Sequence, residues 1–460
     1  ILRAVETHKR ASGRFRTDTV EPVVAEIIAH IKKLKSGIES ITPAGSLRRS
    51  KETIGDLDFL LILAEGHTAQ VKIDVISEHI LKYPRIDQVL AKGGNKVSFT
   101  LDSGLQVDVR LIEKDSYGAA LIYFTGSKEH NVKLRGRAID MGYTLNEYAM
   151  TTLKSGRRVA GSTEEEIYAK VKLDFIPPEL RENCGEIEAA AEHRLPKLVE
   201  LRDIKGDLQM HSTASDGKHT VEAMAETARK LGHEYIAITD HSKSLTITNG
   251  LDEKRLVAHL KALRDVNKKN LGIRVLAGSE VDILKDGKLD YADEFLAQIE
   301  VVVCSIHSFF NLDRVAMTER MLAAIENPYT QIIAHPTGRM ILRRDELDYD
   351  MEKILDACAK HGVAMECNSY PDRLDLKDVY LRMCKQRGVK VVISTDAHNT
   401  LHLPFIRYGV ATARRGWLEK KDVINTLPVE QFLAALRPKP GAAKPAAASV
   451  APEKRSAAKT

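Results

Sequence analysis

The sequence has few cysteines and no long apolar run, and both absences narrow what the protein can be. Its 460 residues contain five cysteines, none of them in a C-x-x-C pair. Scattered thiols in an odd number are typical of a reduced cytosol, so we expect a cytoplasmic protein. No apolar run approaches the roughly 20 residues that span a bilayer, so we expect no membrane association. The first residues also lack the pattern of a secretory signal.

A strong charge of one sign is also lacking. Lys and Arg number 69 against 64 Asp and Glu, for a net charge of +5. This balance permits binding to nucleic acid but does not by itself indicate it. A chain of this length, with 43% hydrophobic residues, is long enough for two or three domains with buried cores. It begins with Ile1 rather than Met, so we expect that an N-terminal part is missing.

The stretch GSLRRSKETIGDLDFLL, residues 45–61, carries the first functional pattern. Its apolar end predicts a buried strand over 59–63, with Asp56 and Asp58 just before it. Residues two apart on a strand share a face, so the two carboxylates emerge side by side. Because like charges repel and are costly to bury, this pair indicates a bound divalent cation, and hard oxygen ligands favour magnesium.

The residues before these aspartates suit phosphate. Gly45 and Ser46 predict a tight turn that offers backbone N–H groups and a hydroxyl. Arg48 and Arg49 follow, and Arg grips phosphate oxygens in a bidentate manner. Turn, arginines and carboxylates together predict a site for a nucleoside triphosphate with its metal. A chance D-x-D on a solvated edge strand is the alternative.

A third carboxylate stands in the alternating segment LQVDVRLI, residues 105–112. Asp108 lies there among apolar residues, where propensity disfavours it. Either it forms a salt bridge with Arg110, or it completes the metal site. Given the first pair, we favour the metal site.

The segment YFTGSKEHNVKLRGRAIDM, residues 123–141, joins an aromatic pair and a glycine turn to a basic helix. Tyr123 and Phe124 beside Gly126 suit stacking on a sugar or base. The basic residues at 128, 133, 135 and 137 share one helix, and such a face is usually only solvated.

These strings resemble the palm and thumb of the family X DNA polymerases, the group that includes polymerase beta, over about residues 20–170. The resemblance implies that Asp56, Asp58 and Asp108 are catalytic and hold two Mg²⁺ ions. It implies that Ser46 and Arg49 contact the β- and γ-phosphates. The full set of nucleotide-binding residues that it implies is Gly45, Ser46, Arg49, Gly55, Tyr123, Phe124, Gly126, Asn131 and Arg135. We expect DNA contacts from Arg48, Lys128, Lys133 and Arg137.

The second half repeats a simple unit. Seven short apolar runs each end in a polar residue, and helical patterns separate most of them. This alternation predicts a parallel sheet, and seven units predict a TIM-like (β/α)₇ barrel with its site at the carboxyl ends of the strands. Several of these polar residues are histidines, and any one histidine after an apolar strand could simply be a hydrogen-bonded core residue. The convergence at one rim indicates a cluster of two or three metal ions, and imidazole with carboxylate suits zinc, manganese or iron. Of these we expect Mn²⁺ or Zn²⁺, and such a cluster fits hydrolysis of phosphate esters. The residues are His211, His241, Glu280, His307, His335, Asp396 and His398.

This half resembles the PHP (polymerase and histidinol phosphatase) domain. The strand-end residues, together with Asp216, fall on eight of the family's nine ligand positions. The ninth, the first histidine of an H-x-H motif, is Gln209 here. An amide oxygen is a weaker ligand than imidazole, so we expect one metal position to be weakened.

The sequence thus predicts an α/β and α+β multidomain chain. We expect the end of the fingers and a nucleotidyltransferase palm over 1–115, a thumb over 116–174, a linker over 175–205, a barrel over 206–436 and a disordered basic tail over 437–460. In the first half we expect helices over 20–34, capped by Asp18 or Thr19, 69–81 and 128–141, and strands over 38–43, 59–63, 89–91, 96–101 and 105–112.

The expected function is gap-filling DNA synthesis in repair, with a 3′–5′ exonuclease in the barrel. The partners would be gapped or primer-template DNA and deoxynucleoside triphosphates, and the protein a monomer. The lyase-like and helix-hairpin-helix parts common in this family are not found in this chain. Two alternatives stay open: a nuclease or phosphatase whose palm only binds DNA, and a non-catalytic repair scaffold.

Overall fold

The palm is built on a mixed five-stranded sheet. A computed structural model describes residues 13–34 and 36–440. The sheet has the order β2-β4-β7-β6-β5, and β4 runs parallel to β7. The elements are β1 (Phe15–Arg16), α2 (Thr17–Ile31), β2 (Ile38–Pro43), α3 (Gly45–Arg48), β3 (Thr53–Ile54), β4 (Asp56–Leu63), α4 (Gln70–Ile80), β5 (Ile86–Gly93), β6 (Lys96–Leu101), β7 (Gln106–Ile112) and η1 (Lys114–Ser116).

Local differences from the predicted elements have simple causes. Helix α2 begins at Thr17, so Asp18 lies in its first turn and Arg16, not Asp18 or Thr19, is the N-cap residue. Strand β4 begins at Asp56, because its pairing with β7 extends through both aspartates. The expected turn at Gly45 and Ser46 is the start of the short helix α3. Strand β5 is longer than predicted, and its outer residues are exposed.

The thumb follows as helices with a small antiparallel sheet in the order β10-β9-β8. Ser127 and Thr163 cap two of its helices by accepting hydrogen bonds from backbone N–H groups. Its elements are α5 (Tyr117–Thr125), α6 (Lys128–Asp140), β8 (Tyr143–Leu145), β9 (Met150–Thr152), β10 (Arg158–Ala160) and α7 (Glu164–Lys170).

Residues 175–205, expected as a linker, contain η2 (Pro178–Leu180), α8 (Glu186–Ala191) and η3 (Leu201–Asp203). Ile176, Leu180 and Ile187 are buried in the same hydrophobic cluster as residues of α5, α6 and α7. The first part of this segment is therefore packed onto the thumb, because its apolar side chains complete the thumb's core.

The second half is a barrel of seven parallel strands in sequential order, as predicted from the repeated apolar runs. Met210 and Ala397 form an isolated parallel bridge that joins the ends of the sheet. The strands are β11 (Gly206–Asp207), β12 (Tyr235–Ile238), β13 (Arg274–Asp282), β14 (Val301–Ser305), β15 (Ile332–Ile333), β16 (Ala364–Asn368) and β17 (Val391–Ser394).

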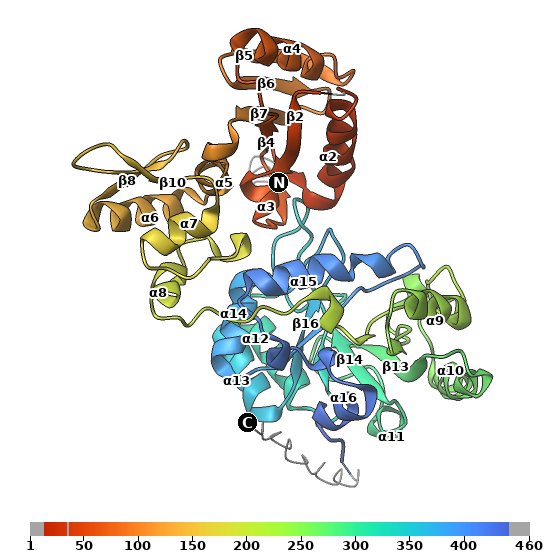
Figure 1. Cartoon of the computed structure of the whole chain (residues 1–460). Helices are drawn as coiled ribbons and strands as arrows, with labels where there is room; N and C mark the ends of the chain where they lie inside the picture. Colours follow the sequence, from red (N-terminus) through yellow and green to blue (C-terminus); the bar gives the residue numbers. More distant parts are fainter. Residues whose placement is uncertain (1–12, 35, 441–460) are drawn as a thin grey trace, which may run out of the picture.

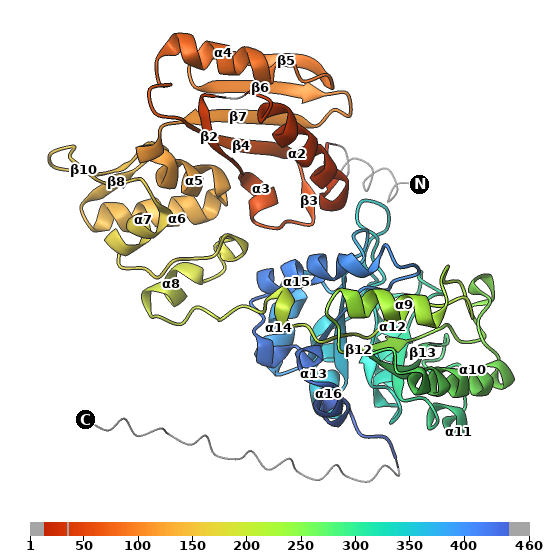
Figure 2. The ribbon, with the colours of Figure 1, turned by 45° about the vertical axis from the view of Figure 1, so that its right-hand side comes forward.

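Helices surround this barrel, and α15 faces the palm and α3 in both views (Figures 1 and 2). They are α9 (Val221–Lys230), α10 (Glu253–Val266), α11 (Asp293–Leu296), α12 (Arg314–Glu326), α13 (Met351–His361), α14 (Asp378–Arg387), α15 (Ile406–Arg415) and α16 (Val429–Ala435), with short 3₁₀ turns η4 (Thr246–Thr248), η5 (Asn267–Lys269), η6 (Leu403–Phe405), η7 (Lys420–Asp422) and η8 (Ile424–Thr426). In the described ranges, no helix has the length and apolar character needed to cross a bilayer.

The start of the predicted tail is bound to the barrel. Arg437 donates hydrogen bonds to the carbonyl oxygens of Ile325 and Asn327, at 2.9 and 2.8 Å. Lys439 reaches the carbonyl of Leu296 at 3.1 Å. The remainder of that prediction, residues 441–460, lies outside the described residues, as do residues 1–12.

A buried ion cluster joins the palm to the thumb. Glu164, at the start of α7, accepts hydrogen bonds from Arg48 at 2.7 Å and Arg181 at 2.6 Å. The side chains of Glu164 and Arg181 are 5% and 0% exposed. Burial alone would raise the pKa of Glu164, but the two arginines outweigh it and hold the pKa below its usual 4.5.

We predict that Glu164→Gln lowers the free energy of unfolding by about 3 kcal/mol, because it leaves buried cations without a charged partner. Urea unfolding followed by the fluorescence of Trp417, which packs against the thumb's core, measures this. Because the carboxylate's contribution is lost as pH falls through its depressed pKa, the difference from wild type should shrink below pH 4.5. Glu165→Gln, at an exposed neighbour, is the control. Equal unfolding midpoints for wild type and Glu164→Gln would contradict the assignment.

Candidate active sites

The palm places its three predicted carboxylates on two adjacent parallel strands. In the register of β4 and β7, Asp58 stands directly opposite Asp108, and Asp56 lies two residues before Asp58. Side chains two apart share a face, so all three belong to one face of the sheet. Gly45 (φ 58°) borders them so closely that a Cβ there would overlap the Asp58 carboxylate. Glycine at this position therefore lets the α3 backbone approach the acids.

The charges of this group are only partly balanced within the protein. Burial, then the carboxylates of Asp56 and Asp108, raise the pKa of Asp58 to about 7. Burial opposes ionisation of Asp108 too, but hydrogen bonds from Ser98 and Lys96 hold its pKa below the usual range. Lys96 Nζ lies 3.0 Å from Asp108 Oδ1, so the salt bridge to Arg110 that we considered is replaced by one to Lys96. Among the described residues no salt bridge reaches Asp58, and Arg110 and Lys96 offset the neighbouring carboxylates only in part. This is the environment that a divalent ion stabilises.

A cleft of about 760 Å³ opens beside these acids, between palm and thumb. Ser46 Oγ is buried there without a hydrogen-bond partner among the described residues, so its hydroxyl can bond to a substrate oxygen. Asp56 and Asp58 line the cleft, whereas Asp108 is not among its lining residues. All nine predicted nucleotide-binding residues do line it: Gly45, Ser46, Arg49, Gly55, Tyr123, Phe124, Gly126, Asn131 and Arg135.

Of the four residues expected to contact DNA, one lines the cleft and three bind other groups of the protein. Lys128 lines the cleft. Arg48 instead pairs with Glu164, Lys133 Nζ lies 2.5 Å from Glu188 Oε1, and Arg137 donates a hydrogen bond to the carbonyl of Val171 at 2.8 Å. Sequence alone could not reveal these partners, because each lies more than 30 residues away.

In the barrel, the predicted strand-end residues do converge. Glu280, at 1% exposure, is the centre. Its Oε1 lies 2.9 Å from His335 Nε2 and 3.3 Å from His307 Nε2, and its Oε2 lies 3.3 Å from His211 Nε2. Burial alone would raise the pKa of Glu280, but the neighbouring imidazoles, led by His241 and His307, hold it well below its usual value.

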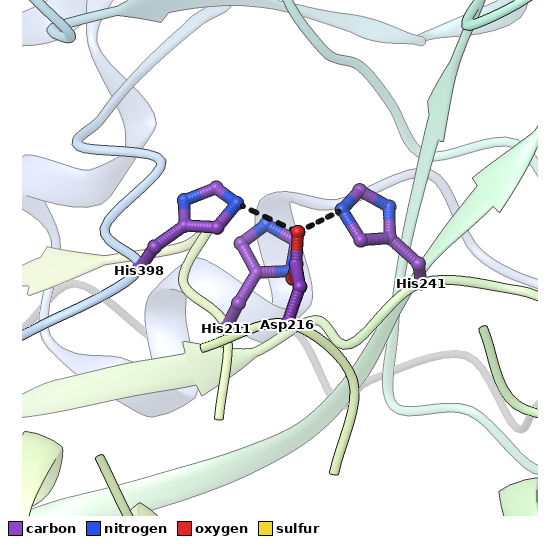
Figure 3. Close-up of side chains that lie close together, drawn as sticks. All are labelled: His211, Asp216, His241 and His398. Carbon is purple, nitrogen blue, oxygen red and sulfur yellow. Dashed lines mark ion pairs between the residues drawn. The ribbon is translucent and has the colours of Figure 1, made fainter. Parts of the chain in front are cut away.

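Asp216 completes the outer part of the same cluster. Its Oδ2 lies 3.4 Å from His398 Nε2 and 3.8 Å from His241 Nε2. Figure 3 shows this carboxylate between the rings of His398 and His241, with His211 beside it. Three overlapping groups have ligand atoms within 4.8 Å of one another: His211, Asp216, His241 and His398; His241, Glu280 and His307; and His211, Glu280 and Asp396.

Several atoms of the cluster fit metal ions better than they fit one another. Nδ1 of His211, His241 and His335, and Oε2 of Glu280, are buried without a hydrogen-bond partner in residues 13–34 and 36–440. Burial lowers the pKa of His241 to about 3. A mixed imidazole and carboxylate set of this kind suits manganese or zinc.

The sequence did not predict a layer of residues that orients the candidate metal ligands. Asp282 Oδ1 lies 2.6 Å from His307 Nδ1 and so orients that ring. Asp207 accepts a hydrogen bond from the backbone of Thr395 at 3.0 Å and supports the turn at Asp396, whose φ is 55°. Asp282 lies two residues after the predicted ligand Glu280, and Asp207 lies two residues before the predicted ligand Gln209. Side chains two apart on a strand share a face, so this spacing could have predicted their supporting role.

Gln209 lies in this layer of the barrel interior. It is 1% exposed, and both its amide oxygen and its amide nitrogen lack hydrogen-bond partners among the described residues. A buried amide without partners is costly, so we expect the Gln209 amide to bind an ion or a water molecule.

Comparisons with known proteins identify relatives of both halves of the chain. Family models match in two regions: the DNA polymerase beta thumb over residues 120–182 and the PHP domain over 207–370. The DNA polymerase/3′-5′ exonuclease PolX of Bacillus subtilis is 39% identical over 439 residues, which are 95% of this chain and 75% of that protein. A probable phosphatase of Acetivibrio thermocellus is 30% identical over 201 residues, 42% of this chain and 78% of its own. One from a Thermoanaerobacter species is 27% identical over 232 residues, 48% of this chain and 90% of its own.

We predict that Gln209→His tightens the weakest-bound Mn²⁺ of the barrel by about tenfold or more, the lower end of the effect of residues that tune metal sites. Calorimetric titration of Mn²⁺ measures this, with Gln209→Ala as the matched control that adds no nitrogen ligand. Superimposable titrations of wild type and Gln209→His would place residue 209 outside the coordination sphere.

Proposed function

The chain belongs to the family X DNA polymerases that carry a PHP domain, and we propose that it fills short gaps in DNA and trims DNA 3′ ends with its barrel. One observation carries the synthetic part: the paired carboxylates of Asp56 and Asp58 open into the same cleft as the nine predicted nucleotide residues.

In the palm, Asp56, Asp58 and Asp108 would hold two Mg²⁺ ions. Such ions activate the primer 3′-hydroxyl and neutralise charge on the triphosphate and the departing pyrophosphate. Ser46 and Arg49 would bind the β- and γ-phosphates. The Ser46 hydroxyl has no hydrogen-bond partner in the part of the chain that the structure describes. Tyr123, Phe124 and Gly126 would lie against the incoming sugar.

The thumb helix would position the base pair. Arg135 and Asn131 line the cleft, and the Asn131 amide donates to the carbonyl of Tyr123 at 2.8 Å. This contact fixes the side chain beside the aromatic pair, where it can read the position of the nascent pair. The substrates are then DNA with a primer end and a deoxynucleoside triphosphate. We propose that the protein acts on them as a cytoplasmic monomer.

In the barrel, we propose two or three Mn²⁺ or Zn²⁺ ions that supply the nucleophile and the charge neutralisation for phosphate-ester hydrolysis. The three overlapping ligand groups support this number. The ligands would be the eight residues named from the family pattern, with Gln209 at the ninth position. His307, oriented by Asp282, would be among the firmest of them because its ring cannot rotate freely.

The similarity of the barrel alone to probable phosphatases favours a second candidate activity, removal of a terminal phosphate from DNA. Analysis of the products distinguishes the two. Exonuclease action releases nucleoside monophosphates and shortens the strand, whereas phosphatase action releases inorganic phosphate from a strand of unchanged length.

We predict that the two activities separate by substitution. Asp56→Ala should lower nucleotide addition by about 1,000-fold, since ions of this kind are worth several kcal/mol to the transition state, and should leave hydrolysis unchanged. His307→Ala should do the reverse. Extension and degradation of one labelled primer are measured together, with circular dichroism to verify folding. If either substitution removed both activities from a folded protein, two independent sites would be ruled out.

A further inference from the structure

A residue of the barrel reaches the back of the polymerase cleft. Arg415, the last residue of α15, donates hydrogen bonds through Nη1 to the carbonyl of Arg49 at 2.8 Å and to Glu182 Oε1 at 3.0 Å. Its Nη2 lies 2.5 Å from Asp378 Oδ2. The Arg415 side chain is only 5% exposed. The guanidinium is therefore enclosed between the palm and the barrel, with an acid on each side.

The same Glu182 carboxylate also holds Arg49. Arg49 Nε donates to Glu182 Oε1 at 3.0 Å, and its Nη1 donates to the carbonyl of Thr125. Arg49 and Glu182 both line the nucleotide cleft. A carboxylate oxygen thus takes the guanidinium that a phosphate oxygen would need, and the two anions are chemically equivalent acceptors for Arg.

We propose that Glu182 holds Arg49 in the nucleotide-free protein, and that Arg415 retains Glu182 when Arg49 turns to the triphosphate. The proposal rests on the assignment of Arg49 to the phosphates under the proposed function. It makes the barrel helix α15 part of the polymerase's nucleotide site, and Arg415 a positioning residue for nucleotide binding.

The physical reason is the cost of an unpaired acid. The Glu182 side chain is 22% exposed, so losing Arg49 without another cation would leave a half-buried charge with little compensation. Arg415 remains on the same oxygen, and Lys51 Nζ lies 3.8 Å away. Lys51 also lines the nucleotide cleft with Arg49 and Glu182, so a second cation is at hand there when Arg49 turns to the triphosphate.

Substitution of Arg415 and substitution of Glu182 should therefore change KM for the nucleotide in different ways. With Arg415→Gln, Glu182 depends on Arg49 and competes harder with the triphosphate, so KM for the nucleotide should rise about tenfold, within the coupling measured for contacting charges. With Glu182→Gln, the competitor is neutral, and KM should stay equal or fall. The double variant should return KM to within about twofold of wild type, because without the Glu182 charge Arg415 has nothing to retain.

The experiment measures KM and kcat for single-nucleotide addition on gapped DNA with the wild-type chain, the two single variants and the double variant. Arg414→Gln is the matched control: Arg414 is the adjacent residue of α15 and bonds Glu179 at 2.7 Å, but no contact of it with Arg49 or Glu182 is described. Its KM should equal that of wild type. Hydrolysis by the barrel should be the same in all variants, which shows that the barrel stays folded.

Three results would overturn the proposal: an unchanged KM in Arg415→Gln, a raised KM in Glu182→Gln, or a double variant as impaired as Arg415→Gln. Arg49→Gln separates this from failure of the proposed function. If Arg49→Gln leaves KM unchanged, the phosphate assignment is wrong. If it raises KM while Arg415→Gln does not, only the role of Arg415 is wrong.

Discussion

The cost of holding like charges together without a counter-ion governs both halves of this chain. In the barrel, two buried carboxylates share one imidazole: His211 Nε2 lies 3.3 Å from Glu280 Oε2 and 3.2 Å from Asp396 Oδ1. In the palm, Asp58 faces Asp108 across two strands, beside Asp56. Parallel strands create both situations, because they bring functional side chains to one edge or one face. Divalent cations would relieve the repulsion, and under the proposed function the same cations would supply the chemistry.

Charged side chains join the two halves, and Trp417 of the second half adds an apolar contact with the thumb's core. Arg339 of the barrel pairs with Glu52 of the palm at 2.6 Å, and Arg407 pairs with Glu21 at 2.5 Å. Arg415 adds the buried contact with Glu182. Such pairs fix orientation with geometric precision but give modest stability where they are exposed. The charged pairs at this junction therefore contribute more to the alignment of the two sites than to the stability of the chain.

The sequence was most informative where function follows strand periodicity. The seven barrel strands, the strand-end histidines and the aspartates of β4 and β7 were all located from alternation and spacing. Contacts between distant segments were beyond that reasoning. Arg48 looked like a DNA contact but pairs with Glu164, and Glu182 lay in an expected linker but faces the nucleotide cleft. The partner of a long charged side chain depends on how the domains pack, so it can be identified only from the tertiary structure.

Two separate metal-dependent sites on one chain should each bind Mn²⁺. Anomalous diffraction at the manganese edge, from crystals grown with Mn²⁺ and a non-hydrolysable deoxynucleoside triphosphate, can locate both. We expect one set of peaks between Asp56, Asp58 and the phosphates, and a second set among His211, Glu280 and Asp396. Peaks in only one half, with full nucleotide density in the cleft, would contradict this expectation.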